Sequence, residues 1–165
     1  MKKIKIKKIT LLRILLFVLI ATWAILVFAF SNQSGEESTG ISRMVAQFLF
    51  RDDYKAEIAE PYIRKLAHFS EYGLGGVLFM CLFLTYEWSD RKRIGISILF
   101  GVWYAAFDEV HQLMVPDRSG NILDVGIDML GFCTGVIFAM LVYKIILSIK
   151  QKKEIGESWW KILKK

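Results

Sequence analysis

Cysteine is scarce in this sequence, and so are motifs that identify a reaction. The chain of 165 residues has two cysteines, Cys81 and Cys133, and both lie within apolar runs. This placement implies no disulfide framework and favours two small buried hydrophobic side chains. The HExxH motif of zinc enzymes, internal repeats and low-complexity stretches are also absent. The function must therefore be sought in the spacing of polar residues.

Apolar residues are abundant instead, since they make up 55% of the chain and gather in long runs. Such a composition is typical of a membrane protein, and a spanning helix needs roughly 20 mostly apolar residues. Four runs reach that length, at residues 11–30, 66–86, 94–115 and 125–147. The third does so only if its helix continues through polar residues toward Pro116. The sequence predicts one all-α membrane domain, residues 1–165, with four transmembrane helices.

Basic residues are distributed unevenly along the chain. Of the 22 Lys and Arg residues, 16 lie in the N-terminal segment, the loop after the second span and the C-terminal tail. Only six lie in the segments on the other side of the predicted spans. Because segments rich in Lys and Arg stay inside the cell, both termini should be cytoplasmic. The net charge of +6 then reflects topology, and no nucleic-acid partner is expected.

Two segments outside the spans predict amphipathic helices. In the predicted outer loop 31–62, four apolar residues recur at helical spacing: Ile41, Val45, Phe48 and Leu49. This short outer helix is suited to line a substrate groove, to cover the bundle as a lid, or to anchor it at the interface. In the tail, three apolar residues share one face among lysines: Ile155, Trp159 and Leu163. They indicate an interfacial helix on the inner leaflet.

Ionisable and polar residues gather at the predicted outer ends of spans two, three and four. Within each group, residues three or four positions apart share a helix face. The groups are Arg64, His68, Glu71 and Tyr72; Asp108, Glu109, His111 and Gln112; and Asp124 and Asp128, with Arg118 in the turn before them. Because these charges are costly against lipid, they should face one another or a wet cavity. Gly131 and Gly135 follow on the face of Asp128 and permit close helix packing.

Three interpretations of these groups remain open. They could be a structural network of paired charges that fixes helix packing. They could be a catalytic or ligand site, in which His and carboxylate groups do acid–base work or hold a divalent metal such as Zn²⁺ or Mn²⁺. Ion or proton transport is the third, but it needs a polar path across the membrane. The inner halves of spans two to four offer only Cys81, Thr85, Ser97 and Thr134.

The polar segments resemble the VanZ-like family of bacterial polytopic membrane proteins. The resemblance rests on residues 64–72, 108–112, 116–120 and 124–135, and it extends over about residues 11–147. Asp117 stands where the family's Pro-x-Arg turn is expected to have Gly, and Asp tolerates turn geometry. One family member is associated with low-level resistance to the lipoglycopeptide teicoplanin. The resemblance implies a plasma-membrane protein but not a settled reaction.

The function that follows is action at the outer leaflet on cell-envelope lipid or lipid-linked wall precursors, with a contribution to teicoplanin resistance. The candidate catalytic residues are His68, Glu71, Asp108, Glu109, His111 and Asp128. The candidate ligand-binding residues are Arg64, Tyr72, Gln112, Arg118 and Asp124, the two arginines being suited to phosphate or carboxylate. The alternative is a non-catalytic membrane scaffold that alters envelope assembly.

Overall fold

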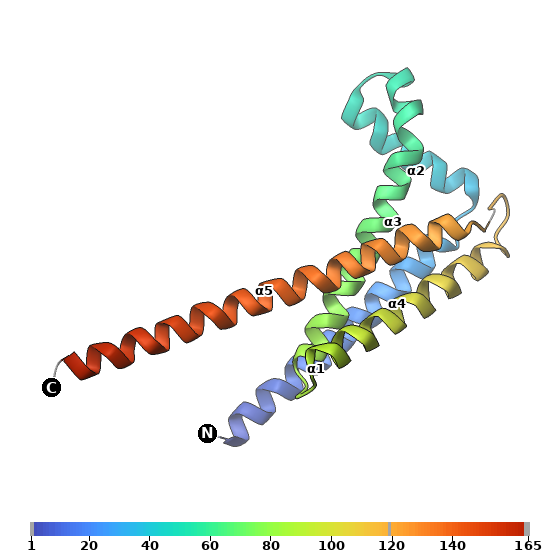
Figure 1. The fold of residues 1–165 in the computed structure, drawn as a ribbon. Coiled ribbons are helices and arrows are strands. Elements are labelled where there is room, and N and C mark those ends of the chain that lie inside the picture. The colour runs from blue at the N-terminus through green and yellow to red at the C-terminus, as the bar shows by residue number, and fades with distance from the viewer. Residues whose placement is uncertain (1, 119, 164–165) are drawn as a thin grey trace.

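Five α-helices account for most of the chain in the computed structural model, which describes residues 2–118 and 120–163, with side chains over 6–118 and 120–154. The helices are α1 (Lys2–Ser31), α2 (Gly35–Phe50), α3 (Asp53–Leu84), α4 (Asp90–Gln112) and α5 (Ile122–Leu163) (Figure 1). These described residues form no strand. The prediction of an all-α protein is confirmed.

Three of the helices are long and apolar enough to cross a membrane. The segments are Ile6–Ser31, Asp53–Leu84 and Ile122–Glu154, in α1, α3 and α5. Large apolar side chains on these helices and on α4 remain exposed, as expected for surfaces in contact with lipid. The 23 residues of α4 extend for about 35 Å, but both its ends are charged. A fourth span in α4 therefore stays a prediction.

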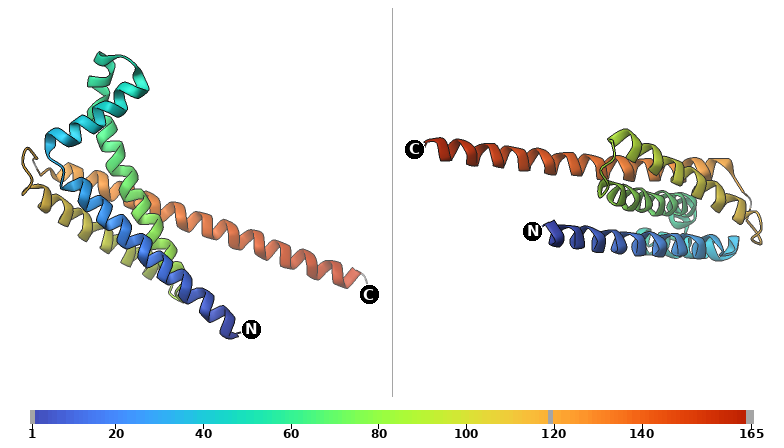
Figure 2. Two further views of the ribbon diagram at one scale, coloured as in Figure 1. Left: turned by 180° about the vertical axis from the view of Figure 1, so that it is seen from behind. Right: turned by 90° about the horizontal axis from the view of Figure 1, so that it is seen from below.

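Helix α3 is the central element, because it contacts each of the other four helices. It lies between α1 and α5, as the right-hand view of Figure 2 shows. Helices α1 and α4 end, and α5 begins, at the same end of the bundle, which we call the α4–α5 end. The opposite end, where α3 ends and α4 begins, is the α3–α4 end. Both termini lie toward the α3–α4 end in Figures 1 and 2.

The crossing of α3 and α5 brings the two backbones into contact. A Cβ atom on Gly131 would overlap the carbonyl oxygen of Phe69, and one on Gly135 would overlap that of Gly73. The close approach predicted for Gly131 and Gly135 is thus confirmed, and the partner is α3. Because the crossing begins three residues after Asp128, it fixes where Asp128 stands relative to α3.

Helix α2 begins with a capping box between Ser34 and Glu37. Its buried face consists of small and polar residues: Ser38, Ser42 and Ala46. Its apolar residues are exposed instead, as with Phe48 at 78%. An amphipathic helix of a soluble protein shows the opposite arrangement. The predicted helix is present, and its outward apolar face is that of a helix lying against lipid.

The structure differs from the predicted boundaries in three places. Helix α3 begins at Asp53 rather than near residue 66, because Asp52 caps it through the Lys55 amide at 3.0 Å and the helix continues through Pro61. The loop predicted over 31–62 is therefore mostly a helical hairpin of α2 and early α3, which projects from the bundle in Figure 1.

The other two differences concern α4 and α5. Helix α4 ends at Gln112, before Val115, because a turn precedes Pro116. No separate tail helix forms, since α5 runs without a break to Leu163. The apolar face predicted for Ile155, Trp159 and Leu163 lies outside the described side chains.

Candidate functional site

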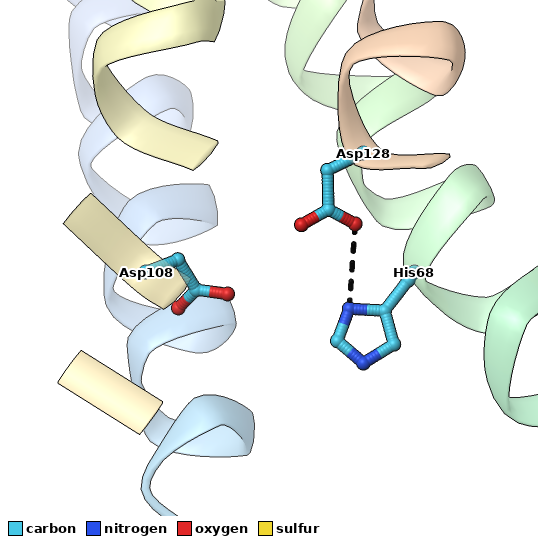
Figure 3. A group of neighbouring side chains, drawn as sticks. All are labelled: His68, Asp108 and Asp128. Atoms are coloured by element: carbon cyan, nitrogen blue, oxygen red, sulfur yellow. Dashed lines mark ion pairs between the residues drawn. The ribbon is translucent and has the colours of Figure 1, made fainter. Parts of the chain in front are cut away.

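Three side chains from three helices converge at the α4–α5 end. His68 comes from α3, Asp108 from α4 and Asp128 from α5 (Figure 3). The imidazole Nδ1 of His68 lies 3.5 Å from Oδ1 of Asp128. One ligand-type atom of each residue lies within 4.8 Å of the others, and we call this group the His–Asp–Asp cluster. Of the predicted site residues, the structure thus brings these three together.

The cluster contains buried polar atoms without hydrogen-bond partners. Asp108 and Asp128 are 2% and 1% exposed. Oδ1 of Asp128 and Nδ1 of His68 make no hydrogen bond, and neither does the hydroxyl of fully buried Tyr72, one turn along α3 from His68. Oδ2 of Asp108 accepts a hydrogen bond from Nε2 of Gln112 at 3.0 Å. Buried polar groups left unpaired are uncommon, so this region is suited to receive a partner.

A cleft of two adjoining chambers opens beside the cluster. The large chamber measures about 320 Å³ and the small one about 190 Å³. Both are lined by Arg64, His68 and Arg118, which form their shared wall. Asp108 and Glu71 add to the lining of the small chamber. The His–Asp–Asp cluster therefore forms part of the cleft wall, and its most buried member, Asp128, lies behind His68.

Arg118, in the connection between α4 and α5, links that connection to the end of α1 and to α4 by hydrogen bonds. Its guanidinium donates to the carbonyls of Gln33 and Phe30 at 3.0 and 3.3 Å, and to Oε1 of Gln112 at 3.2 Å. Burial lowers the pKa of Arg118, and the positive charge of Arg64 acts in the same direction. An anion in the cleft would therefore be favourable for Arg118, although much of its donor capacity is already used.

Arg64 and Lys65 are the cations of the cleft whose hydrogen-bond donors are less used within the protein than those of Arg118. Arg64 makes one long hydrogen bond, at 3.4 Å, to the hydroxyl of Thr39, and Lys65 is exposed. The large chamber also contains three polar groups that accept hydrogen bonds: Asp117, Asn121 and Asp124. This lining combines cations suited to phosphate with oxygens suited to hydroxyl groups.

Two of the predicted site residues point elsewhere. A carboxylate oxygen of Glu109 accepts a hydrogen bond from the backbone amide of Asn121, so Glu109 shapes the turn before α5. The ring of His111 stacks on Phe28, with the ring centroids 4.5 Å apart. Neither residue lines a chamber of the cleft. Their positions favour structural roles over the catalytic roles suggested by their proximity in sequence to Asp108.

Sequence reasoning missed three polar residues of the large chamber. Lys65 immediately follows Arg64, but in the sequence it is one of the basic residues that the topology rule explains. Asn121 lies in the turn before α5, where no pattern distinguishes it from a loop residue. Asp117 was noted only for its turn, and its φ of 58° lies in the left-handed region that favours Gly, which accounts for the Gly expected there.

The fold and site together define a helical membrane protein with a buried polar cleft near one end of its bundle. Comparison with protein families matches residues 16–144 to the VanZ/LLP1 family, a range that includes every residue of the cleft. The chain therefore belongs to the VanZ/LLP1 family, and the resemblance found in its sequence is confirmed. Comparisons with curated proteins and with solved structures gave no match.

Proposed function

We propose that this protein binds the phosphate-bearing head group of a cell-envelope lipid in the cleft, at the outer face of the bacterial plasma membrane. The lining of the large chamber carries the proposal. Its three basic side chains, Arg64, Lys65 and Arg118, suit phosphate, and the oxygens of Asp117, Asn121 and Asp124 suit sugar hydroxyls. A lipid-linked wall precursor contains both phosphate and sugar groups, so it fits better than a simple phospholipid.

The same part of α3 offers a surface for the lipid chain. An apolar groove of about 580 Å³ runs between the end of α2 and the start of α3. It is lined by Leu49, Phe50, Lys55, Ile58, Ala59, Tyr62, Ile63 and Leu66. Over residues 58–68, α3 thus presents an apolar side to the groove and a polar side to the cleft. A lipid needs both surfaces, because its head is charged and its chain is apolar.

The orientation of the cleft follows from the bias in basic residues. Sixteen of the 22 Lys and Arg residues lie on the side of the termini, and this bias supports an orientation with the α4–α5 end outside the cell. Acylated glycopeptide drugs insert their chain into that same leaflet, and each buried CH₂ group contributes about 0.8 kcal/mol. A protein that binds wall precursors in that leaflet would change how many of them are available to the drug. This mechanism leaves the peptide end of the precursor unaltered.

Direct binding tests the first part of the proposal. The protein in phosphatidylcholine nanodiscs should bind added lipid-linked wall precursor, and Arg64→Gln should weaken binding by about tenfold, or about 1.4 kcal/mol. Arg43→Gln is the matched control, because Arg43 is exposed on α2 and does not line the cleft. Equal binding by wild type and Arg64→Gln would contradict the proposal.

Drug tolerance tests the second part. Expression in a susceptible bacterium should raise tolerance to acylated glycopeptides such as teicoplanin more than to unacylated ones. Arg64→Gln should lose this difference, and Arg43→Gln should retain it. Equal protection against both drug types would indicate a change in the peptide target instead, and would contradict a mechanism based on the membrane.

A further inference from the structure

We propose that His68, Asp108 and Asp128 bind one divalent transition-metal cation, of the zinc or manganese class, in the wall of the cleft. The first reason is charge. Two carboxylates that are almost fully buried lie within 4.8 Å of each other and of His68. Within the described part of the chain, neither carboxylate pairs with Lys or Arg, and the one ion-pair contact is that of Asp128 with His68 at 3.5 Å. A buried charge is costly unless it is paired or coordinates a metal.

The second reason is that the cluster has the unfilled hydrogen-bonding capacity of a binding site. Oδ1 of Asp128 and Nδ1 of His68 are buried and face each other at 3.5 Å, but neither makes a hydrogen bond, and the buried hydroxyl of Tyr72 makes none either. In Figure 3 the carboxylate of Asp108 points toward the space that His68 and Asp128 share. A divalent cation in this space would neutralise both carboxylates and accept the lone pairs that no hydrogen bond uses.

The ligand types indicate the class of metal. Ligand atoms at about 2 Å from a common zinc ion lie roughly 3–4 Å from one another. The 3.5 Å between His68 and Asp128 fits this spacing. An imidazole nitrogen beside two carboxylates suits zinc or manganese, whereas calcium and magnesium prefer oxygen ligands. Three protein ligands with an open position are also the arrangement of catalytic zinc sites.

The surroundings of Asp108 support its role as a ligand. Nε2 of Gln112 donates to Oδ2 of Asp108, and Arg118 donates to Oε1 of Gln112 at 3.2 Å. Outer groups of this kind orient a metal ligand. Because His68 and Asp108 also line the small chamber, the open side of the cation would face the cleft. Contact between the cation and a lipid phosphate rests on the proposed function, whereas the metal site itself does not.

Metal content tests the site directly. The full chain should be purified in detergent without a polyhistidine tag, incubated with Zn²⁺ or with Mn²⁺, and freed of loosely held ions. We expect about one equivalent of one of these metals per chain in the wild type. Asp128→Asn and His68→Ala should each lower that content about tenfold. His111→Ala and Glu109→Gln should retain it, because neither residue belongs to the cluster.

Two further measurements separate loss of metal from loss of fold. Co²⁺ should give visible ligand-field bands with the wild type and His111→Ala but not with Asp128→Asn, while all three keep the same helical circular dichroism. Added Zn²⁺ should raise the unfolding temperature of the wild type and leave that of Asp128→Asn unchanged. Wild type that holds no more metal than Asp128→Asn, or an equal loss in His111→Ala, would overturn the metal site.

The metal site and the proposed function can fail separately. Arg64→Gln should lose binding of the lipid precursor and keep its metal, since Arg64 is not a member of the cluster. Metal binding by Arg64→Gln at the wild-type level supports the site described here. Precursor binding by a wild type that takes up no metal would overturn the metal site and leave the proposed function intact.

Discussion

The two ends of the bundle differ in how completely their buried polar groups are hydrogen-bonded. At the α3–α4 end, Arg13 donates to the hydroxyl and carbonyl of Thr85 at 3.0 and 2.7 Å. Arg93 donates to the carbonyls of Phe83 and Tyr86 at 3.2 and 2.7 Å. These two arginines satisfy the free carbonyls at the end of α3, where a helix has no partners of its own. Their positive charge also suits a helix C-terminus.

At the α4–α5 end, buried polar atoms are left without partners. The described residues with such atoms are Ser31, Glu60, His68, Tyr72, Glu109, His111 and Asp128. All of them lie in the half of the bundle near the α4–α5 end or in the α2–α3 hairpin, and none lies at the α3–α4 end. Buried polar groups are therefore more completely paired at the α3–α4 end, and the unfilled bonding capacity at the α4–α5 end is what the proposed ligand sites require.

The largest loss of stability is expected where the crossing of α3 and α5 supports the site. Gly131→Leu places a side chain against the backbone of Phe69, so the helices must separate. We expect a loss of about 3 kcal/mol in unfolding free energy, together with loss of ligand binding. Gly126→Leu on the same helix is the control, because a Cβ there meets nothing within 4 Å.

Unfolding of both variants in detergent, followed by circular dichroism, checks this expectation. A Gly131→Leu protein as stable as Gly126→Leu would mean that the close crossing is not needed to hold α5 against α3. The position of Asp128 opposite His68 would then not depend on the close approach at Gly131.

The second largest loss is expected at the α3–α4 end itself. Arg93→Ala leaves the carbonyls of Phe83 and Tyr86 without their charged donor. Hydrogen bonds to charged groups contribute about 1.5–3 kcal/mol, so a loss of about 2 kcal/mol is expected. Arg91→Ala, at an exposed neighbour, should change stability by less than about 0.5 kcal/mol. Reduced precursor binding by folded Arg93→Ala would contradict the separation of the two ends.

A smaller effect is expected at Asp90, which is partly exposed at the α3–α4 end. Hydrogen bonds from Lys144 and Arg93 lower the pKa of Asp90 from its usual 3.8. Pairing thus favours the charged form, and its contribution is present above pH 3.8 and lost as the pH falls through the lowered pKa. Thermal unfolding of the wild type and Asp90→Asn should differ at neutral pH and converge in acid. A difference that grows in acid would contradict this pairing.

Much of the fold could be predicted because lipid imposes simple rules on a sequence. Apolar length predicts α1 and α5, and helical spacing predicts α2 from Ile41 and its neighbours. The early start of α3 could not be predicted, because the segment from Asp53 to Pro61 mixes charged and apolar residues without a clear period. Its helix depends on the Asp52 cap and on packing against α2, and that packing exists only in the folded chain.

The sequence predicted where the candidate site lies better than it predicted which residues belong to it. Helix direction and residue counting place His68, Asp108 and Asp128 at one depth, and the structure brings these three together. Helical spacing could not separate Asp108 from its neighbours Glu109 and His111. The side chain of Glu109 is directed by its hydrogen bond with the Asn121 amide, and that of His111 by stacking on Phe28. Both partners lie outside segment 108–112, so the spacing within that segment does not reveal them.

Substitution of the cluster carboxylates should change stability least of all, although it should reduce ligand binding most. In metal-free protein, Asp108→Asn removes a buried charge without a Lys or Arg partner, and Asp128→Asn removes one that faces only His68, at 3.5 Å. Because a buried carboxylate that is not fully paired is costly, unfolding free energy should stay within about 1 kcal/mol of wild type in both variants. Binding of metal and of the lipid precursor should nevertheless fall. A structural network predicts the reverse, because breaking a buried ion pair costs about 3–5 kcal/mol. Unfolding in the presence of a chelator, followed by precursor binding in nanodiscs, measures both quantities. If either variant loses several kcal/mol or disappears from the membrane, the α4–α5 end is built for stability as well, and the difference between the two ends is not one of function.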